Sequence, residues 1–324
     1  MRIAIVGAGA IGCWIGGRFA AAGHEVSVLA RGATLAALRG SGLRLTEAGA
    51  TRSWPVRASD SAAELGAQDL VVIAVKAPAL AAVAPAVAGL LSDETVVVPA
   101  MNGIPWWFAD GLGPAEAATR AAVDPEGAIG AAIPHRHVIG CVVHASVATA
   151  DPGCAVHNMG NGVILGEPAG GASARLSRVV EAFAQAGFDA TAAAAIRRDI
   201  WYKLWGNMTM NPVSAITGAT ADRILDDTDV RSLLLAVMAE AAETGARIGC
   251  PIDELGEARI EVTRKLGAFR TSMLQDADAG RPIELEALVG APRAIAAAVG
   301  VPTPYTDVLY GLTRLFGETH GLTP

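Results

Sequence analysis

The sequence predicts an α/β fold, a doubly wound and mainly parallel sheet, followed by an all-α carboxyl-terminal domain. Two observations lead to this prediction. Short branched apolar runs alternate with helical patterns through the first half of the 324 residues, and beyond about residue 190 the strand patterns stop and long helical patterns take over. An alanine-rich run marks the change, so we expect a dinucleotide-binding domain over 1–192 and a helical domain over 193–324.

The amino-terminal elements follow one another in a strand, helix, strand rhythm, which is typical of parallel pairing. The predicted elements are the strand "RIAIVG", the helix "AIGCWIGGRFAAAG", and the strands "EVSVLA", "DLVVIAVK" and "TVVVPA". A further strand pair is expected in "VIGCVVHASV" and "AVHNMGNGVILGE", the second of which should turn near Gly160 to Gly162. Helical patterns then cover residues 200–217, 228–249, 255–279 and 284–299.

Composition narrows the classes of protein to consider. A net charge of −7 with no basic patch gives no support for nucleic-acid binding. No apolar run is long enough to span a membrane, and no secretory signal pattern opens the chain, so a cytoplasmic location is the default expectation. The four cysteines are scattered, and His135 and His137 lack further ligands nearby, so no metal site is expected. The apolar faces of the predicted helices are compatible with a homodimer, and equally with packing inside one domain.

The segment "GAGAIG" (Gly7, Ala8, Gly9, Ala10, Ile11, Gly12) follows the first predicted strand and opens a helix. In this Rossmann pattern the first glycine permits a tight turn, the second lets backbone approach a pyrophosphate, and the third allows close packing of helix on sheet. The helix amino terminus then faces the phosphates. The position of the motif directly after "RIAIV" makes it a strong prediction of dinucleotide binding.

Polar residues end three of the predicted strands. Arg31 stands at the end of the second strand, where an acidic residue would hold the ribose of NAD, and its guanidinium suits a 2′-phosphate, so NADP(H) is the expected cofactor. Lys76 and Asn102 close later strands at the edge where such sheets bind ligands. A solvated lysine and a turn-forming Asn-Gly are the alternatives for these two residues.

The helix over 200–217 carries Lys203, Asn207 and Asn211 on one face of an otherwise apolar segment. A buried ammonium needs a partner, because desolvation disfavours its charged form. This face therefore predicts one wall of a polar cleft. The alternative is a lysine that reaches the surface beside two unrelated asparagines.

At this point the sequence resembles the ketopantoate reductase (2-dehydropantoate 2-reductase) family. The resemblance spans nearly the whole chain through "GAGAIG", Arg31, "VVIAVKA", "MNG", "KLWGNMTMNPVSAIT", "SMLQD" and "RPIELEALVG". It implies an oxidoreductase that uses NADPH to reduce 2-dehydropantoate to (R)-pantoate in pantothenate and coenzyme A biosynthesis, with a small 2-keto acid as its partner.

The resemblance also implies roles for individual residues. Lys203 would be the general acid, Asn207 and Asn211 would lie near the substrate, and Ser272 would contact it. Glu284 would receive the distal hydroxyl of the substrate, and Asn102 and Lys76 would lie where cofactor and substrate meet. From the residues alone, Ser272 could equally be a helix-interior serine, and Glu284, like Glu286, could only complement a helix dipole.

Two departures from the family pattern put the substrate in question. "IPWW" follows "MNG", and "AFRT" precedes the serine of "SMLQD". Paired tryptophans either pack as core or line a pocket for a bulkier keto acid. A paralogue that reduces another 2-keto acid is therefore the main alternative, and a non-catalytic NADP(H) sensor is the alternative from another class. The group that would hold the substrate carboxylate stays open among Arg270, Arg281, Ser272 and Asn102.

Overall fold

The computed structural model describes residues 1–323. The chain forms two compact units, which we call the sheet unit (residues 1–101 with 128–199) and the helical unit (residues 102–127 with 200–323). The segment 102–127 therefore belongs with the helices, although it precedes the expected limit at residue 192. The fold class, a parallel α/β region followed by helices, is confirmed.

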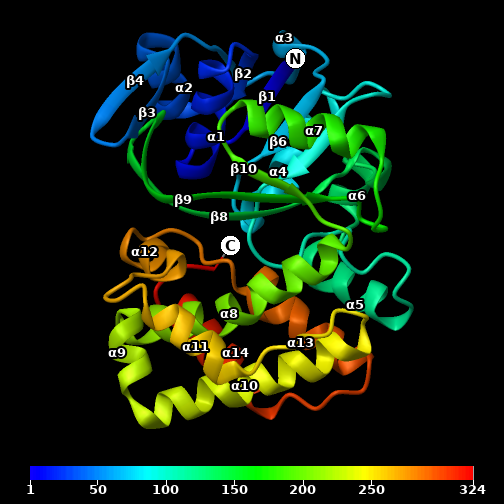
Figure 1. Ribbon diagram of the computed structural model, residues 1–324, viewed down its shortest axis with the longest axis vertical. Coiled ribbons are helices and arrows are strands. Elements are labelled where there is room, and N and C mark those ends of the chain that lie inside the picture. The colour runs from blue at the N-terminus through cyan, green and yellow to red at the C-terminus, as the bar shows by residue number, and fades with distance from the viewer. Residues whose placement is uncertain (324) are drawn as a thin grey trace. The chain divides into compact units, whose positions relative to one another are not determined.

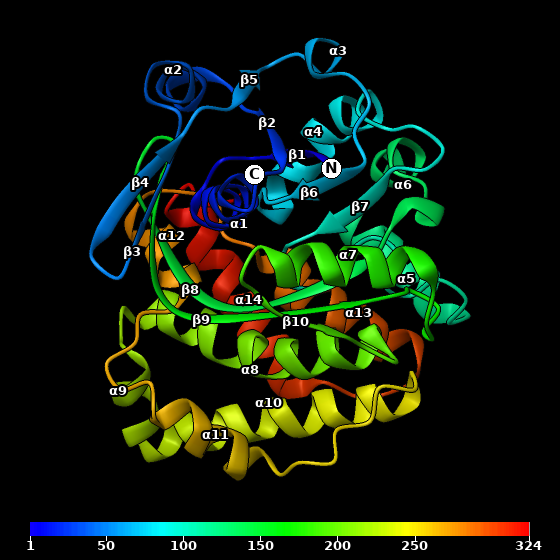
Figure 2. The same ribbon diagram turned by 45° about the horizontal axis from the view of Figure 1, so that its top comes forward.

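The sheet unit contains a five-stranded parallel sheet in the order β5-β2-β1-β6-β7 (Figure 2). The strand order reverses between β1 and β6, which marks the ligand-binding crevice in doubly wound sheets. The bounds are β1 (Arg2–Val6), β2 (Glu25–Leu29), β5 (Arg57–Ser59), β6 (Leu70–Ile73) and β7 (Val96–Pro99). The helices of this unit are α1 (Ala10–Ala21), α2 (Gly32–Ser41), α3 (Ala62–Leu65), α4 (Ala77–Ala88), α6 (Ala128–Ala132), the 3-10 turn His135–His137 and α7 (Ala174–Gln185).

A second sheet of the same unit contains the expected strand pair, β8 and β9, and three strands that were not expected, β3, β4 and β10. Its order is β10-β9-β3-β4, and β8 pairs with β9. The bounds are β3 (Leu43–Glu47), β4 (Ala50–Trp54), β8 (Gly140–Asp151), β9 (Cys154–Gly166) and β10 (Asp189–Ala192). Helix α1 contacts strands of both sheets and buries Trp14 and Phe19 in their shared core.

The turn expected near Gly160 to Gly162 is wrong. Strand β9 runs through these residues, and the chain reverses earlier, at Gly153 between paired Asp151 and Cys154. The glycines instead accompany a change of pairing register opposite His144 and Ser146, because Gly160 adopts a φ of 78° that a regular strand residue does not. Glycine is common in both bulges and turns, so its presence in the sequence does not distinguish them.

The helical unit contains the long helices α8 and α10 with shorter ones around them (Figure 1). The helices are α5 (Pro114–Val123), α8 (Ile196–Thr217), α9 (Ala221–Asp226), α10 (Thr228–Arg247), α11 (Gly256–Arg264), α12 (Ser272–Asp278), α13 (Ala291–Ala298) and α14 (Pro304–Thr319). The indole N–H groups of Trp201 and Trp205 donate to the carbonyl oxygens of Ala241 (3.1 Å) and Met238 (2.8 Å) on α10. These bonds join α8 to α10 along their buried faces.

The helix expected over 255–279 is two helices. Helix α11 ends at Arg264, a loop through Gly267 follows, and Thr271 caps α12 by accepting from the Leu274 N–H. The cap and the glycine interrupt a helical pattern that is otherwise continuous in sequence. Ser272 consequently opens α12 and is not a helix-interior residue.

All four cysteines, Cys13, Cys141, Cys154 and Cys250, are buried thiols that form no disulfide within residues 1–323. Burial is the main reason that the pKa of Cys13 is raised to about 12, with neighbouring Cys154 adding to the effect. Among residues 1–323 no helix has both the length and the apolar character needed to cross a membrane. Within the same range no three potential ligand side chains gather as a metal site would require.

Candidate active site

The glycine turn of the sheet unit leaves room for a ligand at one of its three glycines. A Cβ on Gly7, whose φ is 93°, would lie 2.6 Å from Val75 Cγ1, and a Cβ on Gly12 would lie 1.9 Å from the Gly7 carbonyl oxygen. A Cβ on Gly9 would meet no atom within 4 Å. Gly7 and Gly12 are thus required by packing, whereas the space above Gly9 suits the pyrophosphate of a dinucleotide.

The residues around the glycines support the same use. Ala8 and Gly12 are buried, Ala10 and Ile11 are half-buried, and Gly9 is the exposed N-cap of α1 without a side-chain cap. The uncapped N–H groups of the first helical turn are donors suited to an anion. These features fit a bound dinucleotide.

Arg31 and Lys76 belong to the same edge of the parallel sheet. Arg31 is exposed and is the N-cap of α2 just beyond β2, and Lys76 is the N-cap of α4 just beyond β6. Because the carboxyl ends of parallel strands share an edge, these two cations and the glycine turn after β1 lie along it. A cation directly before a helix amino terminus is a favourable setting for a phosphate group.

In the helical unit, Lys203 of α8 donates from Nζ to Asn102 Oδ1 at 2.8 Å. The two residues are 101 positions apart, and the loop with Asn102 comes directly after β7. Lys203 is half-buried. The ammonium is therefore fixed by an amide oxygen, and it does not extend freely into solvent.

Asn211, two turns further along α8, is buried and donates from Nδ2 to Ser272 Oγ at 3.5 Å, a long contact. Asn207 lies between Lys203 and Asn211 along the helix and is half-buried. The structure thus joins the expected residues in two pairs, Asn102 with Lys203 and Asn211 with Ser272.

The two glutamates of "IELEALVG" have different surroundings. Glu284 is only 5% exposed. Glu286 is exposed, accepts from the Tyr310 hydroxyl at 2.8 Å, and folds over Gly290. Glu286 therefore bonds to α14 at the surface, and Glu284 is the buried carboxylate of the two.

A second face of α8 holds a polar cluster next to Lys203. Tyr202 donates to Glu254 at 2.5 Å, and the Arg259 guanidinium lies 5.0 Å from the Tyr202 ring centre. Burial, followed by the bond to Glu254, raises the pKa of Tyr202 above its ordinary value of 10.0. Gly206 leaves room for Arg259, because a Cβ at position 206 would lie only 3.3 Å from Arg259 Nη2.

The arginines considered for the substrate carboxylate are already paired with carboxylates. Arg281 Nε lies 3.0 Å from the buried Asp276, and Arg270 pairs with Asp278. The tryptophans of "PWW" are core residues, since Trp106 is 6% exposed and Trp107 is fully buried. Neither ion pair could be read from the sequence, because Arg281 reaches Asp276 only after the chain turns back at Gly280, and Arg270 reaches Asp278 only across the length of α12.

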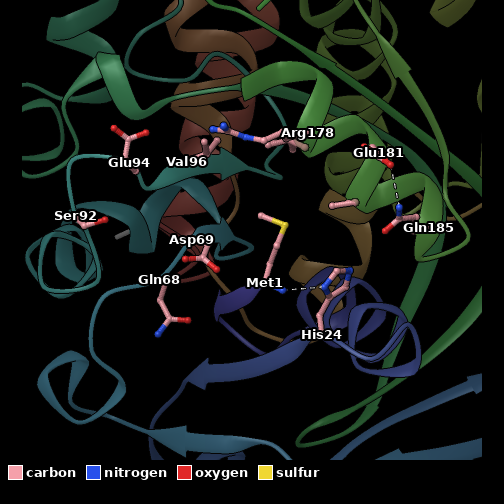
Figure 3. Close-up of a pocket in the computed structure, with 12 residues that line it drawn as sticks. Met1, His24, Gln68, Asp69, Ser92, Glu94, Val96, Arg178, Glu181 and Gln185 are labelled. Carbon is pink, nitrogen blue, oxygen red and sulfur yellow. Dashed lines mark hydrogen bonds between the residues drawn. The ribbon is translucent and has the colours of Figure 1, made fainter. Parts of the chain in front are cut away.

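A cavity of about 490 Å³ lies elsewhere in the sheet unit (Figure 3). It borders the amino ends of β1, β6 and β7, the edge opposite the glycine turn, and is lined by Met1, His24, Asp69, Glu94 and Arg178 among others. Burial raises the pKa of Asp69, but hydrogen bonds from the Arg2 N–H and guanidinium outweigh it and leave the pKa below its ordinary value of 3.8. This cavity is separate from the sheet edge that carries the glycine turn, Arg31 and Lys76, which we call the cofactor edge.

A glycine turn at the switch point of a parallel sheet places the protein in the class of dinucleotide-binding proteins. Family models agree: "Ketopantoate reductase PanE/ApbA" matches residues 3–170, and "Ketopantoate reductase PanE/ApbA C terminal" matches residues 195–316. The chain belongs to the ketopantoate reductase PanE/ApbA family, as its sequence resemblance predicted.

Individual relatives extend over the full length. A 2-dehydropantoate 2-reductase of Mesorhizobium japonicum is 42% identical over 323 residues, 99% of each chain. The crystal structure of a candidate ketopantoate reductase from Ralstonia solanacearum MolK2 is 59% identical with a TM-score of 0.96, covering 99% of each chain. D-mandelate dehydrogenase, in a ternary structure with NADH and anilino(oxo)acetate, shares the fold at 20% identity, a TM-score of 0.84 and complete coverage of both chains.

Proposed function

We propose that the protein is an NADPH-dependent 2-dehydropantoate 2-reductase with Lys203 as its general acid. The observation that carries the proposal is the Lys203 Nζ to Asn102 Oδ1 hydrogen bond of 2.8 Å, which holds the ammonium in one orientation on a buried helix. The 42% identity to a 2-dehydropantoate 2-reductase over nearly the whole chain supports the choice of substrate.

The cofactor edge of the sheet unit would hold NADPH, which supplies a hydride to the keto carbon when bound. The Gly9 backbone and the first turn of α1 would receive the pyrophosphate, and Arg31 before α2 would receive the 2′-phosphate. Lys76 would stand beside the cofactor at the next strand end.

Reduction of a ketone places negative charge on the carbonyl oxygen. An oriented ammonium stabilises this charge and then transfers a proton to it, which together lower the barrier by several kcal/mol. Asn102 would keep Lys203 in the orientation that this transfer needs, since its amide oxygen accepts one of the three ammonium protons. The product hydroxyl would then receive its proton from Lys203 Nζ.

The rest of the substrate would be read by neutral donors and one carboxylate. Because Arg270 and Arg281 are each paired with an aspartate, Ser272, Asn102 and the asparagines Asn207 and Asn211 are favoured for the substrate carboxylate. Glu284 would accept from the distal hydroxyl, and a keto acid without that hydroxyl would lose this charge-assisted hydrogen bond in a buried setting.

The test is NADPH oxidation with 2-dehydropantoate and with 2-ketoisovalerate, which lacks the hydroxymethyl group. We expect 2-dehydropantoate to be preferred in kcat/KM by at least about a hundred-fold, and Glu284→Gln to remove most of that preference. Lys203→Ala should lower kcat by about a thousand-fold, whereas Lys265→Ala, an exposed lysine of the same unit, should not.

Other results would overturn parts of the proposal. Equal turnover of the two keto acids would reject 2-dehydropantoate and favour a family member that reduces another 2-keto acid. Tight NADPH binding without oxidation across a panel of keto acids would reject the enzyme assignment in favour of a sensor.

A further inference from the structure

The helix that follows Glu284 begins irregularly. Its first turn is α-helical, with the Leu288 N–H donating to the Glu284 carbonyl at 3.1 Å. The chain then widens into a π-helical turn, Glu286–Gly290, in which the Ala291 N–H donates to the Glu286 carbonyl. Such single π turns are frequent at functional sites.

The π turn changes the hydrogen bonding of one carbonyl group. The α-helical donor for Ala287 would be the Ala291 N–H, which Glu286 uses, and the next position in the π register is Pro292, which has no N–H. The Ala287 carbonyl instead accepts from the Ile104 N–H at 2.8 Å. Ile104 lies two residues after Asn102, so this bond ties the Asn102 loop to the helix.

The loop lies against this carbonyl without intervening side-chain atoms. Gly103 has a φ of 81°, and a Cβ there would lie 2.6 Å from the Ala287 carbonyl oxygen. Only glycine therefore allows both the left-handed turn and the close approach. Its preceding neighbour, Asn102, accepts from Lys203.

We infer that Gly103 and Pro292 are positioning residues for the Asn102–Lys203 pair. Pro292 leaves the Ala287 carbonyl available, Gly103 lets the loop reach it, and the resulting Ile104 to Ala287 bond holds Asn102 at Lys203 Nζ. The effect on catalysis rests on the proposed function, whereas the anchoring itself does not.

The test uses Pro292→Ala, which restores an N–H beside the Ala287 carbonyl, and Gly103→Ala, which introduces the clash. Pro85→Ala is the control for a proline inside a helix, at an exposed position of α4. Gly300→Ala is the control for a glycine with φ of 75° and no atom within 4 Å of its Cβ. We expect kcat to fall about ten- to a hundred-fold in the two test variants while the KM for NADPH stays within about two-fold, and both controls to behave as wild type.

Two further readouts distinguish positioning from a general loss of structure. In an Asn102→Ala background Pro292→Ala should cost little more, because it acts through Asn102; independent, additive losses would overturn the positioning role. Hydrogen exchange of the Ile104 amide should speed up about ten-fold or more in Pro292→Ala, and unchanged exchange would overturn the anchor even if wild-type protein reduced no keto acid.

Discussion

The cofactor edge of the sheet unit and the polar residues around Lys203 in the helical unit are formed in different ways by the chain. The first uses backbone groups and the space above one glycine within residues 7–12, with cations at the next strand ends. The second depends on side chains that meet from distant positions, as Asn102 and Lys203 do. A short local motif therefore predicts the first, whereas the second needs the whole fold.

The strongest test of this difference is a double-mutant cycle on the pair in the helical unit. Lys203→Ala should lower kcat by about a thousand-fold and Asn102→Ala by about ten- to a hundred-fold, because the amide orients the ammonium but does not supply the proton. The double variant should be no worse than Lys203→Ala alone, measured as kcat for NADPH oxidation. Additive losses would mean that the two residues act independently.

Two glycines of the turn are needed for different reasons: Gly9 leaves space for a ligand, whereas Gly12 allows close packing. Gly9 has φ −80° and ψ −161°, which alanine tolerates, so Gly9→Ala should keep the melting temperature and weaken NADPH binding by about a hundred-fold, as measured by calorimetry. Gly12→Ala should lower the melting temperature, because its Cβ would meet the Gly7 carbonyl. Equal melting temperatures for the two variants would contradict this division.

Arg31 tests whether a side chain at the cofactor edge sets cofactor choice. Arg31→Ala should raise the KM for NADPH about ten- to a hundred-fold, since a charge-assisted contact to the 2′-phosphate is worth about 1.5–3 kcal/mol, and should leave the KM for NADH nearly unchanged. Arg57→Ala, on the neighbouring edge strand β5, serves as the control. A parallel rise for both cofactors would show that Arg31 does not read the phosphate.

The smallest effect concerns an ion pair of the sheet unit, between Glu167 and Arg175 of α7, that includes none of the proposed site residues. The hydrogen bond from Arg175 holds the pKa of Glu167 below its ordinary value of 4.5, against the opposing effect of burial and with help from Ser173. A depressed carboxyl pKa stabilises the folded state above the unfolded value and loses that effect as the pH falls through the folded value. Glu167→Gln should thus lower the free energy of unfolding by about 1 kcal/mol at pH 7, and the difference should shrink steadily below pH 4.5 in urea titrations.

Several elements could be predicted from local pattern, and others could not. The glycine turn, the parallel strands and the face of α8 follow from periodicity and turn chemistry. The break between α11 and α12 depends on one capping residue, so the continuous helical pattern predicted a single helix. The bulge in β9 depends on one glycine, and that glycine predicted a turn instead. The π turn after Glu284 and the distinct surroundings of Glu284 and Glu286 depend on Pro292 and Tyr310, which no local rule connects to them.

The buried cysteine thiols are intrinsic probes of local unfolding. Cys13, Cys141 and Cys154 lie in the sheet unit and Cys250 lies in the helical unit. Since alkylation requires an exposed thiolate, each cysteine reacts only when its surroundings open. Mass spectrometry after timed exposure to iodoacetamide would therefore follow the two units separately without any introduced label, and equal rates for all four thiols would mean that the units unfold together.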